Sequence, residues 1–252
     1  MAKSLLVANW KNYPNSLYEA NMLLGGLSRN KKHFKKVSLF IAPPLPYLES
    51  VATKSKTFAH LACQDIAETP AGTHTGVVPV EILKSFGVEL AIIGHSERRA
   101  LGETDVIVSQ KAKKAINAGI TPLICVGEKS RDHEGHHFEF LREQIKGSLS
   151  GLSHKKGGLK FVVAYEPIWA IGREATGAIE AADLTESVIF IKKVLNDIFG
   201  RKTADRIPIL YGGSVDGLNA EKLFTKTGIR GYLVGRASLN PKTFEAIAHA
   251  IS

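Results

Sequence analysis

The sequence has little cysteine and no long apolar segment. Its 252 residues include only two cysteines, Cys63 and Cys125, each inside a short apolar run, so we expect buried thiols in a reducing compartment and no disulfide framework. No apolar run approaches the length of about 18 residues that spans a bilayer. The opening MAKSLLVANWKN lacks the long apolar core and the cleavage site of a signal peptide. The sequence therefore predicts a cytoplasmic protein without a membrane partner.

Flexible linkers, low-complexity tracts and internal repeats are also missing, which favours one domain over residues 1–252. The 44% hydrophobic and 23% charged residues are typical of a globular chain and exclude a disordered or collagen-like one. A closed barrel of alternating strands and helices commonly fills this length as a single domain.

Acidic residues are scarce in the first quarter of the chain. Of the net charge of +9, residues 1–60 carry most, with nine basic and two acidic side chains. Five of the basic residues lie close together: Arg29, Lys31, Lys32, Lys35 and Lys36. A nucleic-acid site would need stacking aromatics or a reading motif, whereas only His33 and Phe34 interleave here, and Phe34 could pack inward. We expect a solvated surface and no nucleic-acid partner, with a polyanion-binding patch as the alternative.

What is present is a repeated alternation of short apolar runs with longer amphipathic stretches. The eight runs are Leu5–Asn9, Val37–Ala42, Phe58–Gln64, Leu90–Gly94, Thr121–Val126, Phe161–Tyr165, Ile207–Tyr211 and Gly231–Val234. Near-continuous apolar runs indicate strands covered on both faces, as in a parallel sheet. Eight strand–helix units predict an α/β protein with an eight-stranded parallel (β/α)8 barrel, and an open doubly wound sheet is the alternative.

The stretch after the sixth run shows the helical pattern best. Its apolar residues fall on one helical face: Leu184, Val188, Ile191, Val194, Leu195 and Ile198. Asp183 is a candidate N-cap, and Gly200 is a candidate stop.

In such a barrel the active site lies at the carboxyl ends of the strands. The first run ends in Asn9-Trp10-Lys11, where alternation along an extended chain points Asn9 and Lys11 to one side and Trp10 to the other. The fourth run ends in GHSERR at 94–99. If Ser96 begins a short helix, the helix N-terminus disfavours a charged imidazole, so His95 stays neutral and can donate a hydrogen bond.

The sixth run ends in Glu166, which follows a wholly apolar strand, and an apolar wall favours a carboxylate that is basic enough to take a proton. Pro167 fixes the chain after it. The following segment, which includes Gly172-Arg173-Glu174-Ala175-Thr176-Gly177, is interpreted as a lid with an apolar inner face and glycine hinges.

The seventh and eighth runs end in glycine-rich turns, Tyr211-Gly212-Gly213-Ser214 and Val234-Gly235-Arg236. Backbone N–H groups in such turns form a phosphate site, which barrels often place after strands seven and eight. Together the groups suit proton abstraction next to a carbonyl in a small phosphorylated substrate. Glu166 would be the base, and His95 and Lys11 would stabilise the enediolate oxygens. This chemistry needs no metal ligand set and no nicotinamide fingerprint.

The motifs Asn9-Trp10-Lys11, GHSERR, YEPIWAIG at 165–172, YGGSV at 211–215 and LVG at 233–235 resemble those of the triosephosphate isomerase family from the first strand to the last. The resemblance implies a TIM barrel that interconverts dihydroxyacetone phosphate and D-glyceraldehyde 3-phosphate without a cofactor, as an obligate homodimer. This family is a standard example of a glutamate base paired with a neutral histidine, and the resemblance gives Glu166 and His95 those same two roles.

The resemblance also assigns residues. It makes Glu97 a supporting carboxylate, and Asn9 and Lys11 part of the substrate site. The backbone N–H groups of Gly172, Ser214 and Gly235 become phosphate donors, beside Arg236. Thr75, in Gly72-Thr73-His74-Thr75-Gly76, becomes the residue that reaches the neighbouring subunit's Asn9/Lys11 region.

The chain departs from the family at three places. Asn12-Tyr13 follow Lys11 where the family has MN or LN, and the lid has Arg173-Glu174 where the family continues with T-G. Arg236 stands where a second glycine is common. We expect Arg236 to have a negative φ, because a positive φ would cost it about 1–2 kcal/mol, and its N–H would then still serve the phosphate.

Two alternatives remain. His133-Glu134-Gly135-His136-His137 matches a zinc-protease pattern that works only on one helix; we interpret it as a solvated, adventitious cluster and expect no metal. A catalytically weak homologue that binds polyanions or surfaces through the basic first quarter is the alternative to an active isomerase.

Overall fold

The computed structural model describes residues 3–132, 134–152, 160–170 and 179–252. Eight parallel strands follow one another around a closed barrel, and β1 pairs with β8 from Leu5↔Gly231 to Ala8↔Val234. The strands are β1 (Ser4–Asn9), β2 (Val37–Ala42), β3 (His60–Cys63), β4 (Leu90–Ile93), β5 (Thr121–Val126), β6 (Val162–Tyr165), β7 (Ile209–Tyr211) and β8 (Gly231–Val234). The predicted (β/α)8 barrel is confirmed, and the open sheet is wrong because the β1–β8 pairing leaves no edge.

All eight predicted strands are present, and several are shorter than predicted. β7 begins at Ile209, not Ile207, because Pro208 has no N–H to donate to the ladder; its carbonyl still accepts from the Val163 N–H at 3.0 Å. β3 covers only His60–Cys63 of the predicted 58–64.

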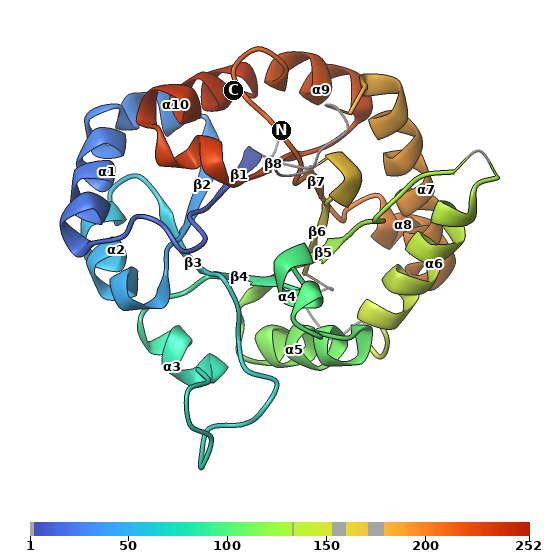
Figure 1. Ribbon diagram of the computed structural model, residues 1–252, viewed down its shortest axis with the longest axis horizontal. Coiled ribbons are helices and arrows are strands. Elements are labelled where there is room, and N and C mark those ends of the chain that lie inside the picture. Colours follow the sequence, from blue (N-terminus) through green and yellow to red (C-terminus); the bar gives the residue numbers. More distant parts are fainter. Residues whose placement is uncertain (1–2, 133, 153–159, 171–178) are drawn as a thin grey trace.

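A ring of helices surrounds the barrel (Figure 1). The α-helices are α1 (Leu17–Arg29), α2 (Leu48–Ser55), α3 (Val80–Ser85), α4 (Ser96–Ala100), α5 (Asp105–Asn117), α6 (His136–Ser148), α7 (Ala181–Phe199), α8 (Arg201–Ala204), α9 (Ala220–Thr227) and α10 (Pro241–Ala250). Short 3-10 turns are η1 (Lys31–Phe34), η2 (Leu45–Tyr47), η3 (Ile168–Ala170) and η4 (Arg236–Leu239). The loop between β3 and α3 projects outward from this ring.

Helix α7 follows the predicted pattern with two corrections. The predicted buried face is present in Leu184, Val188, Ile191, Val194 and Leu195, and Gly200, with φ +75°, ends the helix. Asp183 is not the N-cap, since the helix begins at Ala181 and Asp183 lies in its first turn. Ile198 is not on the buried face: it is 36% exposed, while its neighbour Phe199 packs on Phe161 with ring centroids 5.7 Å apart.

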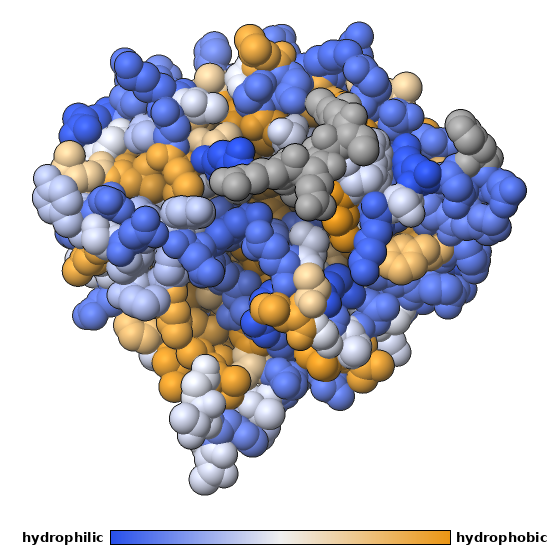
Figure 2. Space-filling model, viewed as in Figure 1, coloured by the Kyte–Doolittle hydropathy of each residue, from blue (hydrophilic) through white to orange (hydrophobic). Residues whose placement is uncertain are grey.

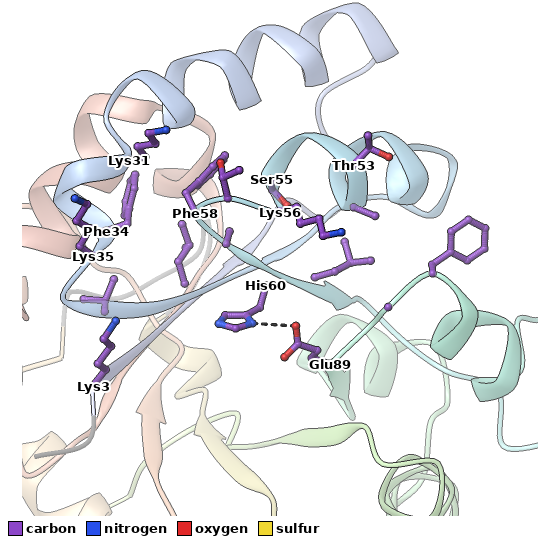
Figure 3. Close-up of a pocket in the computed structure, with 18 of the residues that line it drawn as sticks. Lys3, Lys31, Phe34, Lys35, Thr53, Ser55, Lys56, Phe58, His60 and Glu89 are labelled. Carbon is purple, nitrogen blue, oxygen red and sulfur yellow. Dashed lines mark hydrogen bonds and ion pairs between the residues drawn. The ribbon is translucent and has the colours of Figure 1, made fainter.

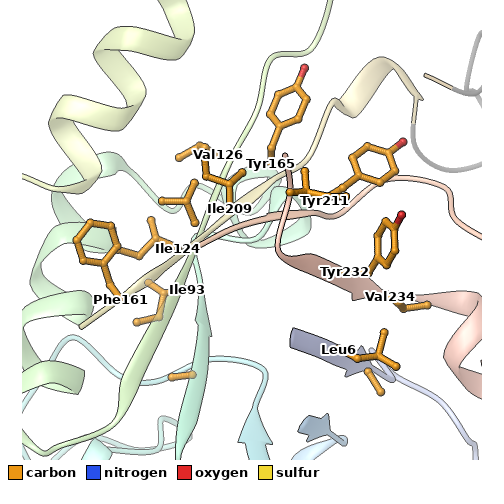
Figure 4. Packing of buried hydrophobic residues seen from close by; sticks show 14 of the residues in the cluster. Leu6, Ile93, Ile124, Val126, Phe161, Tyr165, Ile209, Tyr211, Tyr232 and Val234 are labelled. Atoms are coloured by element: carbon orange, nitrogen blue, oxygen red, sulfur yellow. The ribbon is translucent and has the colours of Figure 1, made fainter. Parts of the chain in front are cut away.

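Alternation along the strands divides the core into two layers. One layer fills the barrel with residues such as Val7, Ile92, Leu123, Val162 and Leu210. The other lies between strands and helices, where Tyr211 and Tyr232 meet edge to face (Figure 4). Residues that continue the inward series past a strand's carboxyl end therefore point into the mouth of the barrel. This parity places Asn9, Glu166, Gly212 and Gly235 there.

Both cysteines and Phe34 are buried. Cys63 and Cys125 are buried and free, as expected, and Phe34 is buried against Phe244 with ring centroids 5.8 Å apart. Within the described ranges, no helix is long and apolar enough to cross a bilayer.

The zinc-protease pattern does not lie on one helix. Gly135 has φ +82° and α6 begins only at His136, while His133 lies outside the described residues. The expectation that the cluster is solvated holds for His136, whose side chain is 74% exposed, but is wrong for His137, whose side chain is 9% exposed and packs on Phe138.

Candidate active site

The end of β1 holds an ammonium group in a strained turn. Lys11 has φ +52°, and it is the one non-glycine residue with a positive φ among those described. Buried Asn9 accepts the Lys11 N–H on its side-chain oxygen at 3.0 Å, and the Gln64 amide donates to the Lys11 carbonyl at 2.6 Å. A non-glycine residue persists in this conformation only where its surroundings fix it. These bonds direct Lys11 Nζ to Glu97 Oε1, 2.7 Å away.

The turn after β4 presents an imidazole in one protonation state. Gly94 has φ +70°, and a Cβ there would lie 2.7 Å from a Val108 methyl, so a glycine is needed where the chain changes direction. His95 then sits at the N-cap of α4, which begins at Ser96 as predicted. Its Nδ1 accepts the Glu97 N–H at 3.2 Å. A nitrogen that accepts a backbone N–H carries no proton, so His95 is neutral with its proton on Nε2.

Glu166 lies against this imidazole. Its side chain is 3% exposed, Oε2 accepts the Ser96 N–H at 2.9 Å, and Oε1 lies 3.2 Å from His95 Nε2. Among the described residues, Oε1 is buried without an aligned hydrogen bond. One oxygen of the carboxylate is therefore anchored, and the other is available to accept a proton.

Two neighbours shape the surroundings of Glu166. Burial, then the negative charge of Glu166, raise the pKa of the Cys125 thiol well above its usual range, so a neutral thiol lines this side of the base. Directly after β7, a Cβ at Gly212 would lie 2.9 Å from Glu166 Cγ. The glycine leaves the space that the glutamate side chain occupies.

The ends of β7 and β8 face the same mouth. A Cβ on Gly235 would lie 3.4 Å from Lys11 Cε, so the glycine backbone comes close to the lysine. Arg236 begins η4, is exposed and does not have a positive φ, as predicted. Ser214 is exposed after β7. The predicted lid segment Gly172–Gly177 lies outside the described residues, and with it the predicted phosphate donor Gly172.

A buried cluster that sequence analysis missed fixes the chain just before residues 171–178. The Tyr165 hydroxyl, the Trp169 indole N–H and Arg131 Nε all donate to Glu128 Oε1, at 2.7, 2.9 and 3.1 Å. The Arg131 guanidinium also lies over the Trp169 ring, 5.1 Å from its centroid. Arg131 is close to Glu128 in sequence, but Tyr165 and Trp169 come from β6 and the turn after it, so only the place of Glu128 after β5 pointed to this cluster.

Thr75 lies apart from these groups within this chain. It is exposed in the projecting loop between β3 and α3. Figure 2 shows apolar surface on the side of the molecule that carries α1 and α3, beside this loop. Large exposed side chains there are Tyr13, Leu17, Leu45, Val77 and Ile82.

A buried carboxylate, a neutral imidazole and an ammonium group at the mouth of a closed (β/α)8 barrel define an enzyme site that moves protons on a small anionic substrate. Comparison with known proteins is specific. The sequence model of the family described as triosephosphate isomerase matches residues 4–251, and the chain belongs to this family.

Relatives named triosephosphate isomerase align along the full length. The chain is 35% identical to the one from Flavobacterium johnsoniae, with all of both chains covered. It is 38% identical to that of Fusobacterium nucleatum, with 99% of each chain covered. It is 37% identical to that of Nocardia farcinica, covering 98% of this chain and 95% of the relative.

Proposed function

We propose that this chain, as one domain over residues 1–252, interconverts dihydroxyacetone phosphate and D-glyceraldehyde 3-phosphate with Glu166 as the base. The observation that carries the assignment is the distance of 3.2 Å between Glu166 Oε1 and His95 Nε2, the nitrogen that bears the proton of the neutral imidazole. A base and an electrophile side by side act on adjacent atoms of one substrate.

The reaction begins at the hydroxymethyl carbon of dihydroxyacetone phosphate. Glu166 Oε1 takes a proton from this carbon, the C–H electron pair forms the C1–C2 double bond, and the carbonyl pair moves onto the C2 oxygen. Protonated Glu166 later returns a proton to C2, while the C1 oxygen loses its proton and becomes the aldehyde carbonyl. No electrons enter or leave, so the balance requires no cofactor.

Stabilisation of the enediolate falls to His95 and Lys11. The His95 Nε2–H donates to the oxygen that gains charge, and because the imidazole is neutral it can also pass a proton between the two oxygens. Lys11 supplies a positive charge, which Glu97 and Asn9 hold in place. These contacts strengthen as charge develops, so they lower the barrier more than they tighten substrate binding.

The phosphate end is assigned to the backbone N–H groups of Gly172, Ser214 and Gly235, beside Arg236. The approach of Gly235 to Lys11 supports a common anion site for both. The two buried free cysteines are in keeping with a cytoplasmic location.

The function is tested by incubating purified, dialysed protein with dihydroxyacetone phosphate in deuterated water. We expect glyceraldehyde 3-phosphate in a coupled assay, with deuterium at C2, the carbon to which Glu166 returns a proton. Product without solvent deuterium at any turnover level would indicate a hydride shift and contradict the assignment of a carboxylate base.

The homodimer is also a proposal, supported by the exposed apolar side chains around Thr75. Thr75→Arg should weaken the dimer about 100-fold or more, because it brings a cation to the lysine-containing mouth of the neighbour. Sedimentation velocity at micromolar protein should then show monomers. Thr225→Arg, at an exposed position of α9, is the matched control and should remain dimeric. A dimer of unchanged affinity in Thr75→Arg would remove this loop from the interface.

Arg236→Gly tests the departure at the phosphate end. Since Arg236 does not have a positive φ, glycine relieves no strain, and we expect phosphoglycolate affinity to stay the same or to weaken less than about fivefold. Isothermal titration calorimetry measures it. A tenfold gain in affinity would show that the arginine impairs the site.

A further inference from the structure

A groove lies at the opposite end of the barrel from Glu166, among the described residues. This amino-terminal groove runs between η1, α2 and the starts of β2 and β3, with a volume of about 1090 Å³. Its charged lining residues are Lys3, Lys31, Lys35, Lys56, His60 and Glu89 (Figure 3). Lys3 precedes β1, His60 begins β3 and Glu89 precedes β4. The six residues of β1 separate this end from the catalytic mouth by about 20 Å.

The groove has a surplus of unneutralised positive charge. Lys3, Lys31, Lys35 and Lys56 are all exposed, and none of them forms an ion pair with another part of the chain that the structure describes. The acidic lining residue, Glu89, is already engaged by His60 Nδ1 at 2.9 Å. Buried or bridging lysines elsewhere, such as Lys111, have carboxylate partners. The four ammonium groups therefore line one groove and are exposed, without a carboxylate partner among the residues that the structure describes.

The floor of the same groove is apolar. Val37, Leu39 and Leu61 line it from β2 and β3 as nearly buried side chains, and Phe86, which also lines the groove, is 41% exposed and offers the larger accessible apolar surface. An apolar floor below a rim of positive charge matches a ligand that carries both apolar groups and negative charges. The volume of about 1090 Å³ lies just above the range for small-molecule sites, about 300–1000 Å³, and can accept a chain segment.

We propose that the amino-terminal groove binds an acidic segment of a partner protein, with glutamate or aspartate side chains on the lysine rim and an apolar side chain on the floor. Charge complementarity selects the acidic partner, and the recessed apolar floor selects a peptide over a flat membrane surface. A single-stranded nucleic acid would need several exposed aromatic faces for stacking, and Phe34, in the middle of the lysine cluster, is buried against Phe244.

The test is fluorescence anisotropy with a labelled dodecapeptide of glutamate and leucine, two glutamates to each leucine. We compare it with an all-glutamate peptide and with oligodeoxythymidine of equal charge. We expect one saturable site for the mixed peptide, with an affinity at least about fivefold higher than that of the all-glutamate peptide. Raising the salt concentration from about 0.05 to about 0.5 M should lower the affinity for the mixed peptide at least about tenfold.

Charge reversal locates the site. The double variant Lys35→Glu, Lys56→Glu should lower the affinity for the mixed peptide at least about tenfold. The control is Lys193→Glu with Lys202→Glu, which makes the same change of net charge at exposed positions of α7 and α8. It should weaken binding less than about twofold. Both variants should keep wild-type kcat/KM, since none of these lysines touches the catalytic mouth, and this activity shows that they fold.

Three results would overturn the proposal. No saturable binding of the mixed peptide would remove the groove as a peptide site. An equal loss in both double variants would show attraction to the net charge alone. Tighter binding of the oligonucleotide than of the mixed peptide would assign the groove to nucleic acid.

Discussion

Glu166→Gln should lower kcat about 10⁴-fold while KM changes only a few-fold. The amide oxygen can still accept the Ser96 N–H that Glu166 Oε2 accepts at 2.9 Å, so the side chain keeps its place. It cannot take a proton from carbon, and general base catalysis contributes up to about 10⁴-fold. The loss should therefore appear in kcat, because the substrate still binds.

Glu166→Asp separates the position of the base from its chemistry. Shortening the side chain withdraws the carboxylate by about one C–C bond, and a misplacement of about 1 Å costs about 100-fold. We therefore expect kcat for this variant between those of the wild type and Glu166→Gln.

The coupled assay at saturating substrate measures both variants. Glu221→Gln, at an exposed position of α9, is the matched control for loss of a carboxylate, and Lys32→Ala is the control in the basic first quarter. Both should keep wild-type kcat. A Glu166→Gln enzyme within tenfold of wild type would place the base elsewhere, and loss of activity in Lys32→Ala would favour a role for the basic surface in turnover.

Much of the fold was predictable because its signals are local. Buried parallel strands need near-continuous apolar runs, so the eight strands could be found one by one, and their number indicated closure. The turn at Gly200 and the start of α4 at Ser96 were also visible, since glycine and helix-cap chemistry act over a few residues. The Asp183 N-cap was wrong because the helix begins three residues earlier than that cap requires, at buried Ala181.

The site was predictable where strand alternation reaches it. Asn9 and Glu166 continue the inward series of β1 and β6, so their convergence follows from parity once the barrel closes. Lys11 reaches the same mouth from the turn after β1, where its φ is +52°. His95 does not follow its strand's parity. Leu90 and Ile92 point inward, and simple alternation would turn His95 outward; the positive φ of Gly94 redirects it.

Contacts between distant segments were beyond the sequence. The hydrogen bond from the Ser96 N–H to Glu166 joins residues 70 positions apart in the sequence. The Cys125 thiol beside the base was interpreted from the sequence only as a buried strand residue. The Glu128 cluster joins side chains from the ends of β5 and β6 and from α7 through Ser187. Such bonds depend on how the barrel brings strand ends together, and no local pattern signals them.

His95→Gln should lower kcat about 10²–10³-fold, the usual cost of losing one preorganised donor to a developing oxyanion. Glutamine also has an N–H donor. It cannot hold that donor in the position of His95 Nε2 and at the same time accept the Glu97 N–H, as His95 Nδ1 does. The matched control is His137→Gln, because His137 is also 9% exposed at its side chain but lies outside the site. This control should keep wild-type kcat.

The neutrality of His95 can be measured apart from activity. In the ¹⁵N spectrum of the imidazole, Nδ1 should have the shift of an unprotonated nitrogen and Nε2 that of a protonated one at neutral pH. The reason is geometric: the Glu97 N–H points at Nδ1, so a second proton there would face a donor at hydrogen-bond distance. An imidazolium signal at pH 7, or His95→Gln activity within threefold of wild type, would contradict a neutral electrophile and leave Lys11 as the group that stabilises the enediolate.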